Sequence, residues 1–174
     1  IVQSSNIGTA RIAMMIGADR QREFLGSLGL LVETPVEMVE APTGDPLLPS
    51  NWSEISTMTI SYGHGLSSSP VHLATAYASL LNGGYRIEPT IIRQDGPRYG
   101  PRVVSEKVSI TARDMLRAVV VRGTASFGEV EGYEVGGKTG TADKPRSTGG
   151  YYDDRTIATF ASVFPASDPQ YVLI

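Results

Sequence analysis

The segment from Gly132 to Thr139 matches the pattern G-x-x-x-x-G-K-[ST] at every position, and the residues that follow it decide between two folds. In a phosphate-binding loop, a helix begins at the Lys-Thr pair and its amide groups hold the phosphates. The helix-breaking residues that follow here are Gly140, Pro145, Gly149 and Gly150. Because a glycine or a proline inside a helix costs about 1 to 3 kcal/mol, we expect no helix there. The sequence therefore predicts a glycine-rich strand over residues 132–142, with a nucleotide-binding domain as an alternative.

The length of the chain, 174 residues, suits one domain with a core of its own. The chain begins at Ile1 without an initiator methionine, and it stops within the apolar run 171–174. We therefore expect residues 1–174 to form a single domain that is incomplete at both ends and belongs to a longer protein.

The composition argues against several classes of partner. The formal net charge is -3 and lysine and arginine do not cluster, so the basic face that binds nucleic-acid phosphates is not expected. There are no cysteines and only two histidines, which argues against a disulfide framework and a zinc site. No run of residues is long and apolar enough to span a bilayer, and no signal-peptide pattern opens the chain. We predict no cofactor, no metal ion and no nucleic-acid partner.

Apolar periodicity and end signals predict an α+β fold with a largely antiparallel sheet. Helices are expected over residues 7–16, from Asp19 as N-cap to Leu28, from Ser69-Pro70 to Asn82-Gly83-Gly84, and from Thr111 as N-cap. Strands are expected over residues 57–62, 87–92, 132–142, 156–165 and 171–174, the last two as a hairpin. The proline-rich stretch 31–52 is expected to run over the surface, and 96–102 to form a loop. His64 is interpreted as a turn residue and His72 as a surface residue of its helix.

The residues Lys138, Thr139, Gly140 and Thr141 place an ammonium group, hydroxyls and backbone amides on one strand edge. A lysine and a threonine hydroxyl can hold a carboxylate by charge-assisted hydrogen bonds. Gly140 would let a substrate backbone lie against the strand, and the amide of Thr141 could serve an oxyanion. The plainer alternative is an edge lysine beside a turn glycine, with no ligand.

The triplet Ser4-Ser5-Asn6 precedes the first expected helix, where serine and asparagine often cap the helix N-terminus. The chemical alternative is that the Ser4 hydroxyl relays a proton to a leaving amine while the Asn6 amide binds a substrate carbonyl. The motifs S-x-x-K, S-x-N and K-T-G occur in this chain order in penicillin-binding proteins and class A β-lactamases. The second and third of these motifs are present here in that order.

Over nearly its whole length the chain resembles the transpeptidase domain of class B, division-type penicillin-binding proteins. The segments that carry the resemblance are Ser4–Thr9, Ser61–Leu66, Ser69–Ala74 with Tyr77-Ala78, Gly136–Ala142 and Phe164–Pro169. The resemblance implies the penicillin-binding and β-lactamase-like fold, an antiparallel sheet flanked by helices. Residues 1–174 would be part of a transpeptidase domain.

The resemblance also implies roles for individual residues. Ser4 would pass the proton to the departing D-Ala, Asn6 would hold the donor peptide, and Lys138 with Thr139 would bind the terminal carboxylate. Thr141 would supply one amide of the oxyanion hole beside Gly140. The loop tyrosines implied as an aromatic wall for ligands are Tyr151 and Tyr152.

One departure from the family pattern is that no Ser-x-x-Lys occurs anywhere in the chain. The nucleophile and its base are expected upstream of Ile1, so the chain by itself should be inactive. The implied activity is D,D-transpeptidation of peptidoglycan stem peptides ending in D-Ala-D-Ala, with β-lactams as inhibitors. A carboxypeptidase, a β-lactamase and a non-catalytic binding module remain alternatives.

The expected location is the periplasmic face of the bacterial inner membrane, with attachment through one upstream transmembrane helix. Implied partners are a glycan polymerase and other division proteins.

Overall fold

The computed structural model describes residues 1–34, 36–41, 45–146 and 150–174, without the side chains of Pro145 and Tyr151. It has helices and antiparallel strands, which confirms the predicted α+β class. In chain order the elements are α1 (Asn6–Ile16), α2 (Ala18–Ser27), α3 (Glu54–Ser61), α4 (Pro70–Leu81), β1 (Tyr85–Ile87), β2 (Tyr99–Arg102), α5 (Glu106–Arg122), η2 (Ser126–Gly128), β3 (Gly136–Pro145), β4 (Tyr151–Phe164) and β5 (Tyr171–Leu173).

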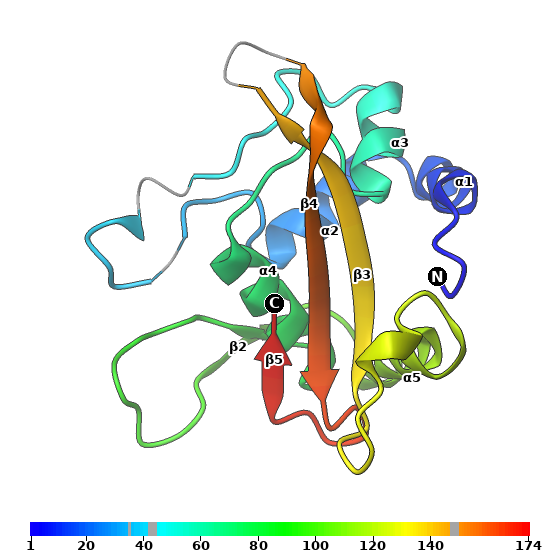
Figure 1. Cartoon of the computed structure of the whole chain (residues 1–174). Coiled ribbons are helices and arrows are strands. Elements are labelled where there is room, and N and C mark those ends of the chain that lie inside the picture. Colours follow the sequence, from blue (N-terminus) through cyan, green and yellow to red (C-terminus); the bar gives the residue numbers. More distant parts are fainter. Residues whose placement is uncertain (35, 42–44, 147–149) are drawn as a thin grey trace.

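The main sheet is antiparallel in the order β3-β4-β5, with β3 at one edge (Figure 1). The predicted final hairpin is confirmed, because Val163 of β4 pairs with Val172 of β5. Helices α4 and α5 pack beside each other against this sheet. The core at their junction joins Leu81 of α4, Leu116 of α5 and Val163 of β4, all of them buried. This packing supports β3 from behind, while β3 itself forms one edge of the sheet.

Helices α1, α2 and α3 contact one another, and α1 and α3 lie beside the upper part of the sheet (Figure 1). Gly17, with φ of 86°, separates α1 from α2 in a conformation that other residues rarely adopt. Gly17 is therefore the N-cap of α2, and the prediction of Asp19 in that position was wrong. Asp19 lies in the first turn, where a carboxylate also favours the helix N-terminus.

The strand predicted over residues 57–62 was wrong, because this segment belongs to helix α3. Ser53 caps the helix by accepting a hydrogen bond from the amide of Ser56, at 3.2 Å. The hydroxyl of Thr57 donates to the carbonyl oxygen of Ser53 at 2.9 Å, and the side chain is buried. A local cap and tertiary burial thus outweigh the alternation of apolar side chains that suggested a strand.

The predicted limits of helix α4 are confirmed, but the predicted surface position of His72 was wrong. Ser69 is the N-cap, and Asn82 ends the helix before two glycines with positive φ. His72 is only 2% exposed, whereas the sequence suggested a surface position. Its Nε2 donates to the carbonyl oxygen of Val32 at 2.8 Å, and its Nδ1 lies 2.8 Å from the Ser69 hydroxyl. Burial is tolerated because both ring nitrogens have hydrogen-bond partners.

Three predictions for residues 87–122 need correction. The strand expected over residues 87–92 ends at Ile87, and Pro89 just beyond lacks the N–H that a ladder requires. The loop expected over residues 96–102 contains strand β2, which pairs with β1. Helix α5 is capped by Ser105 and begins before Thr111, whose hydroxyl bonds back to the Lys107 carbonyl within the helix.

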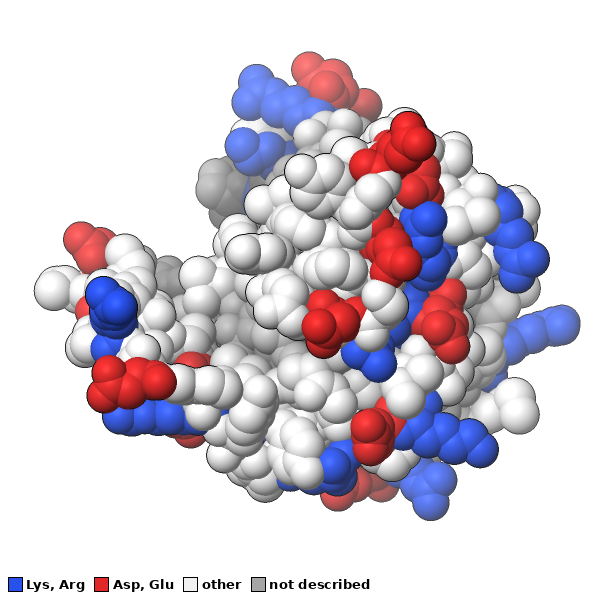
Figure 2. Space-filling view, turned by 90° about the horizontal axis from the view of Figure 1, so that it is seen from below, with Lys and Arg blue, Asp and Glu red and all other residues white. Residues whose placement is uncertain are grey.

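The surface stretch 31–52 contains, among its described residues, a bridge between Leu47 and Ser67 but no long helix or strand. Pro35 and Pro42, on which this prediction partly rested, lie outside the described residues, as does Gly149. Figure 2 shows side chains of both charge signs interspersed on the lower face of the molecule.

Candidate active site

The Nζ of Lys138 donates a hydrogen bond to the Ser4 hydroxyl at 2.8 Å, which joins the two sequence motifs in space. Lys138 lies on the edge strand β3, and Ser4 lies just before α1. The same ammonium group donates to the carbonyl oxygen of Thr139 at 2.7 Å. Ser4 and Lys138, from two motifs far apart in the sequence, are therefore in direct contact.

The Ser4 hydroxyl is available for this contact because its neighbour Ser5 caps the helix. The Ser5 side chain accepts from the amide of Gly8 at 3.1 Å. Ser4 has a φ of 50°, a left-handed conformation that is unfavourable for a residue with a Cβ. Such backbone strain is typical of functional sites. Asn6 is the first residue of α1, and its exposed amide forms no hydrogen bond with a described residue.

Burial lowers the pKa of the Lys138 ammonium from its usual 10.5, because removing water destabilises the charged form. No carboxylate forms an ion pair with Lys138 in the described part of the chain. A partly desolvated cation without an acidic neighbour is a favourable partner for the carboxylate of a ligand.

The three residues after Lys138 lie along the same edge. The hydroxyl of Thr139 lies 3.1 Å from that of Thr124 and 3.5 Å from the Lys138 Nζ. Thr141 is exposed, and at Gly140 the nearest obstacle to an added Cβ is the hydroxyl of Thr159. The structure thus brings Ser4, Lys138 and Thr139 together, with Gly140 and Thr141 next along the strand.

Sequence reasoning missed Thr124, which faces Thr139 from the turn after α5. The available signal was Gly123 directly after an apolar helix, and this signal indicates only where a helix ends. Nothing in the sequence around it shows that the turn lies beside β3.

The structure does not place Tyr152 beside Lys138. Tyr151 pairs with Pro145 at the far end of β3, seven residues beyond Lys138, which corresponds to roughly 20 Å along a strand. The guanidinium groups of Arg146 and Arg155 lie over the Tyr152 ring at 5.2 and 4.7 Å from its centre. The Tyr151 side chain lies outside the described residues, so the aromatic wall remains a prediction.

The nucleotide-binding alternative was wrong. Lys138 and Thr139 lie inside strand β3, which continues to Pro145, and no helix begins at them. The amides that a phosphate would need therefore belong to a strand ladder.

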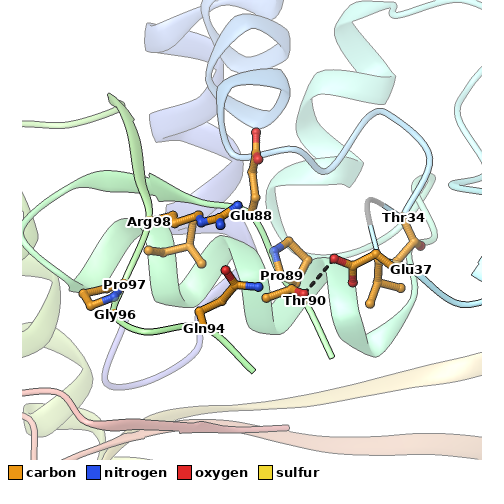
Figure 3. Close-up of a pocket in the computed structure, with 11 residues that line it drawn as sticks. Thr34, Glu37, Glu88, Pro89, Thr90, Gln94, Gly96, Pro97 and Arg98 are labelled. Atoms are coloured by element: carbon orange, nitrogen blue, oxygen red, sulfur yellow. Dashed lines mark hydrogen bonds between the residues drawn. The ribbon is translucent and has the colours of Figure 1, made fainter. Parts of the chain in front are cut away.

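A cavity of about 680 Å³ lies elsewhere, with Thr34, Val36 and Glu37 on one side and residues from the segment 87–98 on the other (Figure 3). Glu37 accepts a hydrogen bond from the Thr90 hydroxyl at 2.7 Å, and this bond lowers the pKa of the carboxyl. None of the predicted site residues lines this cavity.

Across the described ranges, no three histidine, cysteine or acidic side chains are grouped so that they could hold a metal ion. Likewise, none of the described helices combines the length and hydropathy needed to cross a bilayer.

The sequence profile described as "Penicillin binding protein transpeptidase domain" matches residues 1–174. The chain belongs to the penicillin-binding protein transpeptidase family. A relative from Caulobacter vibrioides, named "Probable peptidoglycan D,D-transpeptidase FtsI", is 39% identical over 173 residues. That match covers 95% of this chain and 29% of the relative. Penicillin-binding protein PbpB of Mycolicibacterium smegmatis is 37% identical over 192 residues, which cover 98% of this chain and 29% of the relative.

Solved penicillin-binding proteins share the fold. Penicillin-binding protein 3 of Mycobacterium tuberculosis in complex with ampicillin has a TM-score of 0.86 and 34% identity, over 98% of this chain and 42% of that one. The transpeptidase domain of Burkholderia pseudomallei penicillin-binding protein 3 has a TM-score of 0.86 and 34% identity. This match covers 97% of this chain and 51% of the solved chain. The chain therefore spans under a third of these curated relatives and about half or less of the solved chains.

Proposed function

We propose that this chain carries the second and third active-site motifs of a peptidoglycan D,D-transpeptidase that acts through a serine acyl-enzyme. The observation that carries the proposal is the hydrogen bond of 2.8 Å between Lys138 and Ser4, within a chain of the penicillin-binding family. The substrate would be a stem peptide ending in D-Ala-D-Ala.

The substrate carboxylate would bind to Lys138 and Thr139. The Lys138 ammonium group, which has no carboxylate partner in the described chain, and the neighbouring Thr139 hydroxyl would each donate one hydrogen bond to it. The exposed Asn6 amide would hold the donor peptide by its carbonyl oxygen. Gly140 would leave room for the peptide backbone against β3.

The chemical step would form a bond between a serine oxygen and the carbonyl carbon of the penultimate D-Ala. The serine proton would pass to a base, the peptide C–N bond would break, and the terminal D-Ala would leave with a proton relayed by Ser4. The amide of Thr141 would be one donor to the oxyanion, an interaction typically worth about 3 to 4 kcal/mol. An amine of a second stem peptide would then attack the ester and complete the cross-link.

The nucleophile and its base would come from outside residues 1–174, since the chain contains no Ser-x-x-Lys. We place them upstream, in the same polypeptide, together with one membrane-spanning helix that anchors the protein at the periplasmic face of the inner membrane. β-Lactams would acylate the same serine, because they resemble the D-Ala-D-Ala terminus. The partners would be a glycan polymerase and other division proteins.

The proposal is tested by labelling with a fluorescent penicillin. The product of the complete gene should form a stable covalent adduct that unlabelled penicillin prevents, and the 174-residue chain should form none. An adduct on the chain alone, or no adduct on the complete protein, would contradict the proposal. A stem-peptide assay on the complete protein then separates cross-linking from hydrolysis, and hydrolysis alone would assign a carboxypeptidase.

A further inference from the structure

Thr124 connects the two halves of the candidate site. Its hydroxyl lies 3.1 Å from the Thr139 hydroxyl, and its amide donates to the carbonyl oxygen of Val2 at 3.3 Å. Val2 stands two residues before Ser4, and Thr139 follows Lys138 on β3. One residue of the turn after α5 therefore contacts both the segment that leads to Ser4 and the strand that carries Lys138.

This turn is closely packed. A Cβ at Gly123 would lie 2.8 Å from the carbonyl oxygen of Val2 and 2.7 Å from that of Val119, so only glycine allows this approach of the backbones. Ala125 is fully buried, and its amide donates to the carbonyl oxygen of Val119 at 3.3 Å. Val2 packs against the same buried cluster. Thr124 is thus held between two tightly packed neighbours.

The direction of the hydrogen bonds around Thr139 follows from the donors present. The Lys138 ammonium has no lone pair, so at 3.5 Å it can only donate to the Thr139 oxygen. If the Thr124 hydroxyl also donates to that oxygen, the Thr139 proton has no acceptor in this cluster and points to an external one. A hydroxyl that accepts hydrogen bonds is also a stronger donor.

We propose that Thr124 is a positioning residue that orients the Thr139 hydroxyl toward the carboxylate of the bound substrate or β-lactam. This inference rests on the proposed function, because it assigns the ligand of Thr139 as a carboxylate. Thr124 itself acts through Thr139 and does not touch the reacting atoms.

The test measures acylation rates of the complete protein by two probes, benzylpenicillin and its methyl ester. Thr124→Val keeps the shape of the side chain but removes the hydroxyl, and it should slow acylation by benzylpenicillin about tenfold, the usual value of one hydrogen bond. The methyl ester lacks the carboxylate, so its already slower acylation should change less than about twofold. Thr124→Ser retains the hydroxyl and should restore the benzylpenicillin rate.

The matched control is Thr111→Val, which removes an exposed hydroxyl within α5 and should alter neither rate. If Thr124→Val slowed acylation by both probes equally, or did not slow acylation by benzylpenicillin, the positioning role would be overturned. Failure of Thr124→Ser to recover would overturn it as well. If the unaltered protein reacts with neither probe, the proposed function itself fails, which is a distinct result.

Discussion

The side-chain nitrogen of Lys138 lies 2.8 Å from the hydroxyl oxygen of Ser4, although 134 positions separate the two residues in the chain. One residue lies on the edge strand of the sheet and the other on a strained turn before α1. The contact brings a cation and a proton-carrying hydroxyl to one point of the surface. Two hydrogen bonds to oxygens from separate elements hold the ammonium group in place.

Replacing Lys138 by alanine should lower the rate of acylation of the complete protein by benzylpenicillin about 100-fold. This loss corresponds to about 3 kcal/mol, the upper range for a hydrogen bond to a charged group. The control is Lys144→Ala, which removes an exposed lysine further along β3. Stopped-flow measurement of acylation by both variants tests this, and equal rates would contradict a binding role for Lys138.

The rate of acylation of the complete protein by benzylpenicillin should fall at alkaline pH, and the midpoint of this fall should lie below pH 10.5. Burial lowers the pKa of Lys138, and the cation needed for carboxylate binding is lost as pH rises through that lowered value. Lys138→Arg should shift this limb to higher pH, because a guanidinium stays charged there. A pH profile of acylation for both proteins is the measurement. If the alkaline fall in rate occurred at the same pH in both proteins, a group other than Lys138 would be responsible for it.

The same pKa shift predicts the sign of a stability effect. Between the lowered pKa and 10.5, the unfolded chain holds more protons on Lys138 than the folded chain does. The contribution of this group to the free energy of unfolding should therefore increase with pH in that window. Urea unfolding at several alkaline pH values, compared with Lys138→Met, measures the difference. A contribution that decreases with pH would be inconsistent with desolvation of the ammonium group.

Gly137 and Gly140 should respond differently to substitution by alanine. A Cβ at Gly137 would lie 2.6 Å from the Phe160 ring and 2.8 Å from the Ala161 carbonyl oxygen, so Gly137→Ala should cost about 1 to 3 kcal/mol. At Gly140 the obstacle is the Thr159 hydroxyl, at 2.5 Å, which can rotate away. Gly140→Ala should cost less than about 1 kcal/mol but slow acylation, because the methyl group occupies the path of the substrate.

Urea unfolding and acylation rates of the two variants together test this contrast. Equal destabilisation of both would show that the strand is equally crowded at the two positions. Normal acylation by Gly140→Ala would remove Gly140 from the substrate path.

Replacing His72 by alanine should lower the free energy of unfolding by about 2 to 4 kcal/mol. The substitution leaves a cavity and removes the partner of the Val32 carbonyl oxygen. Val71→Ala, on the neighbouring and more exposed position of α4, should cost less than about 1 kcal/mol. Chemical denaturation of both variants provides the comparison, and similar losses would place His72 at the surface, as its sequence context first suggested.

Local features of the sequence were sufficient for part of the fold. Gly140 and Pro145 argued against a helix after Lys138, and the segment is a strand. Ser69-Pro70 and Asn82 marked both ends of α4 correctly. These signals act between neighbours in the chain, through capping hydrogen bonds and allowed backbone angles, so they hold without knowledge of the rest of the molecule.

Other features depended on contacts between distant segments. Residues 57–61 are helical and His72 is buried because of packing and hydrogen bonds that their own sequence does not reveal. The closeness of Ser4 and Lys138 was expected only from a resemblance to a family, and Thr124 was not expected at all.

The sequence by itself determined which chemical groups are present, that the Lys138 segment is extended, and where helices such as α4 begin and end. Tertiary structure alone decided that Ser4, Lys138, Thr139 and Thr124 meet at one edge of the sheet. The physical reason is that backbone preferences act over a few residues, whereas the distance between Ser4 and Lys138 is set by how α5 packs against β3 and how closely Val2 approaches Gly123.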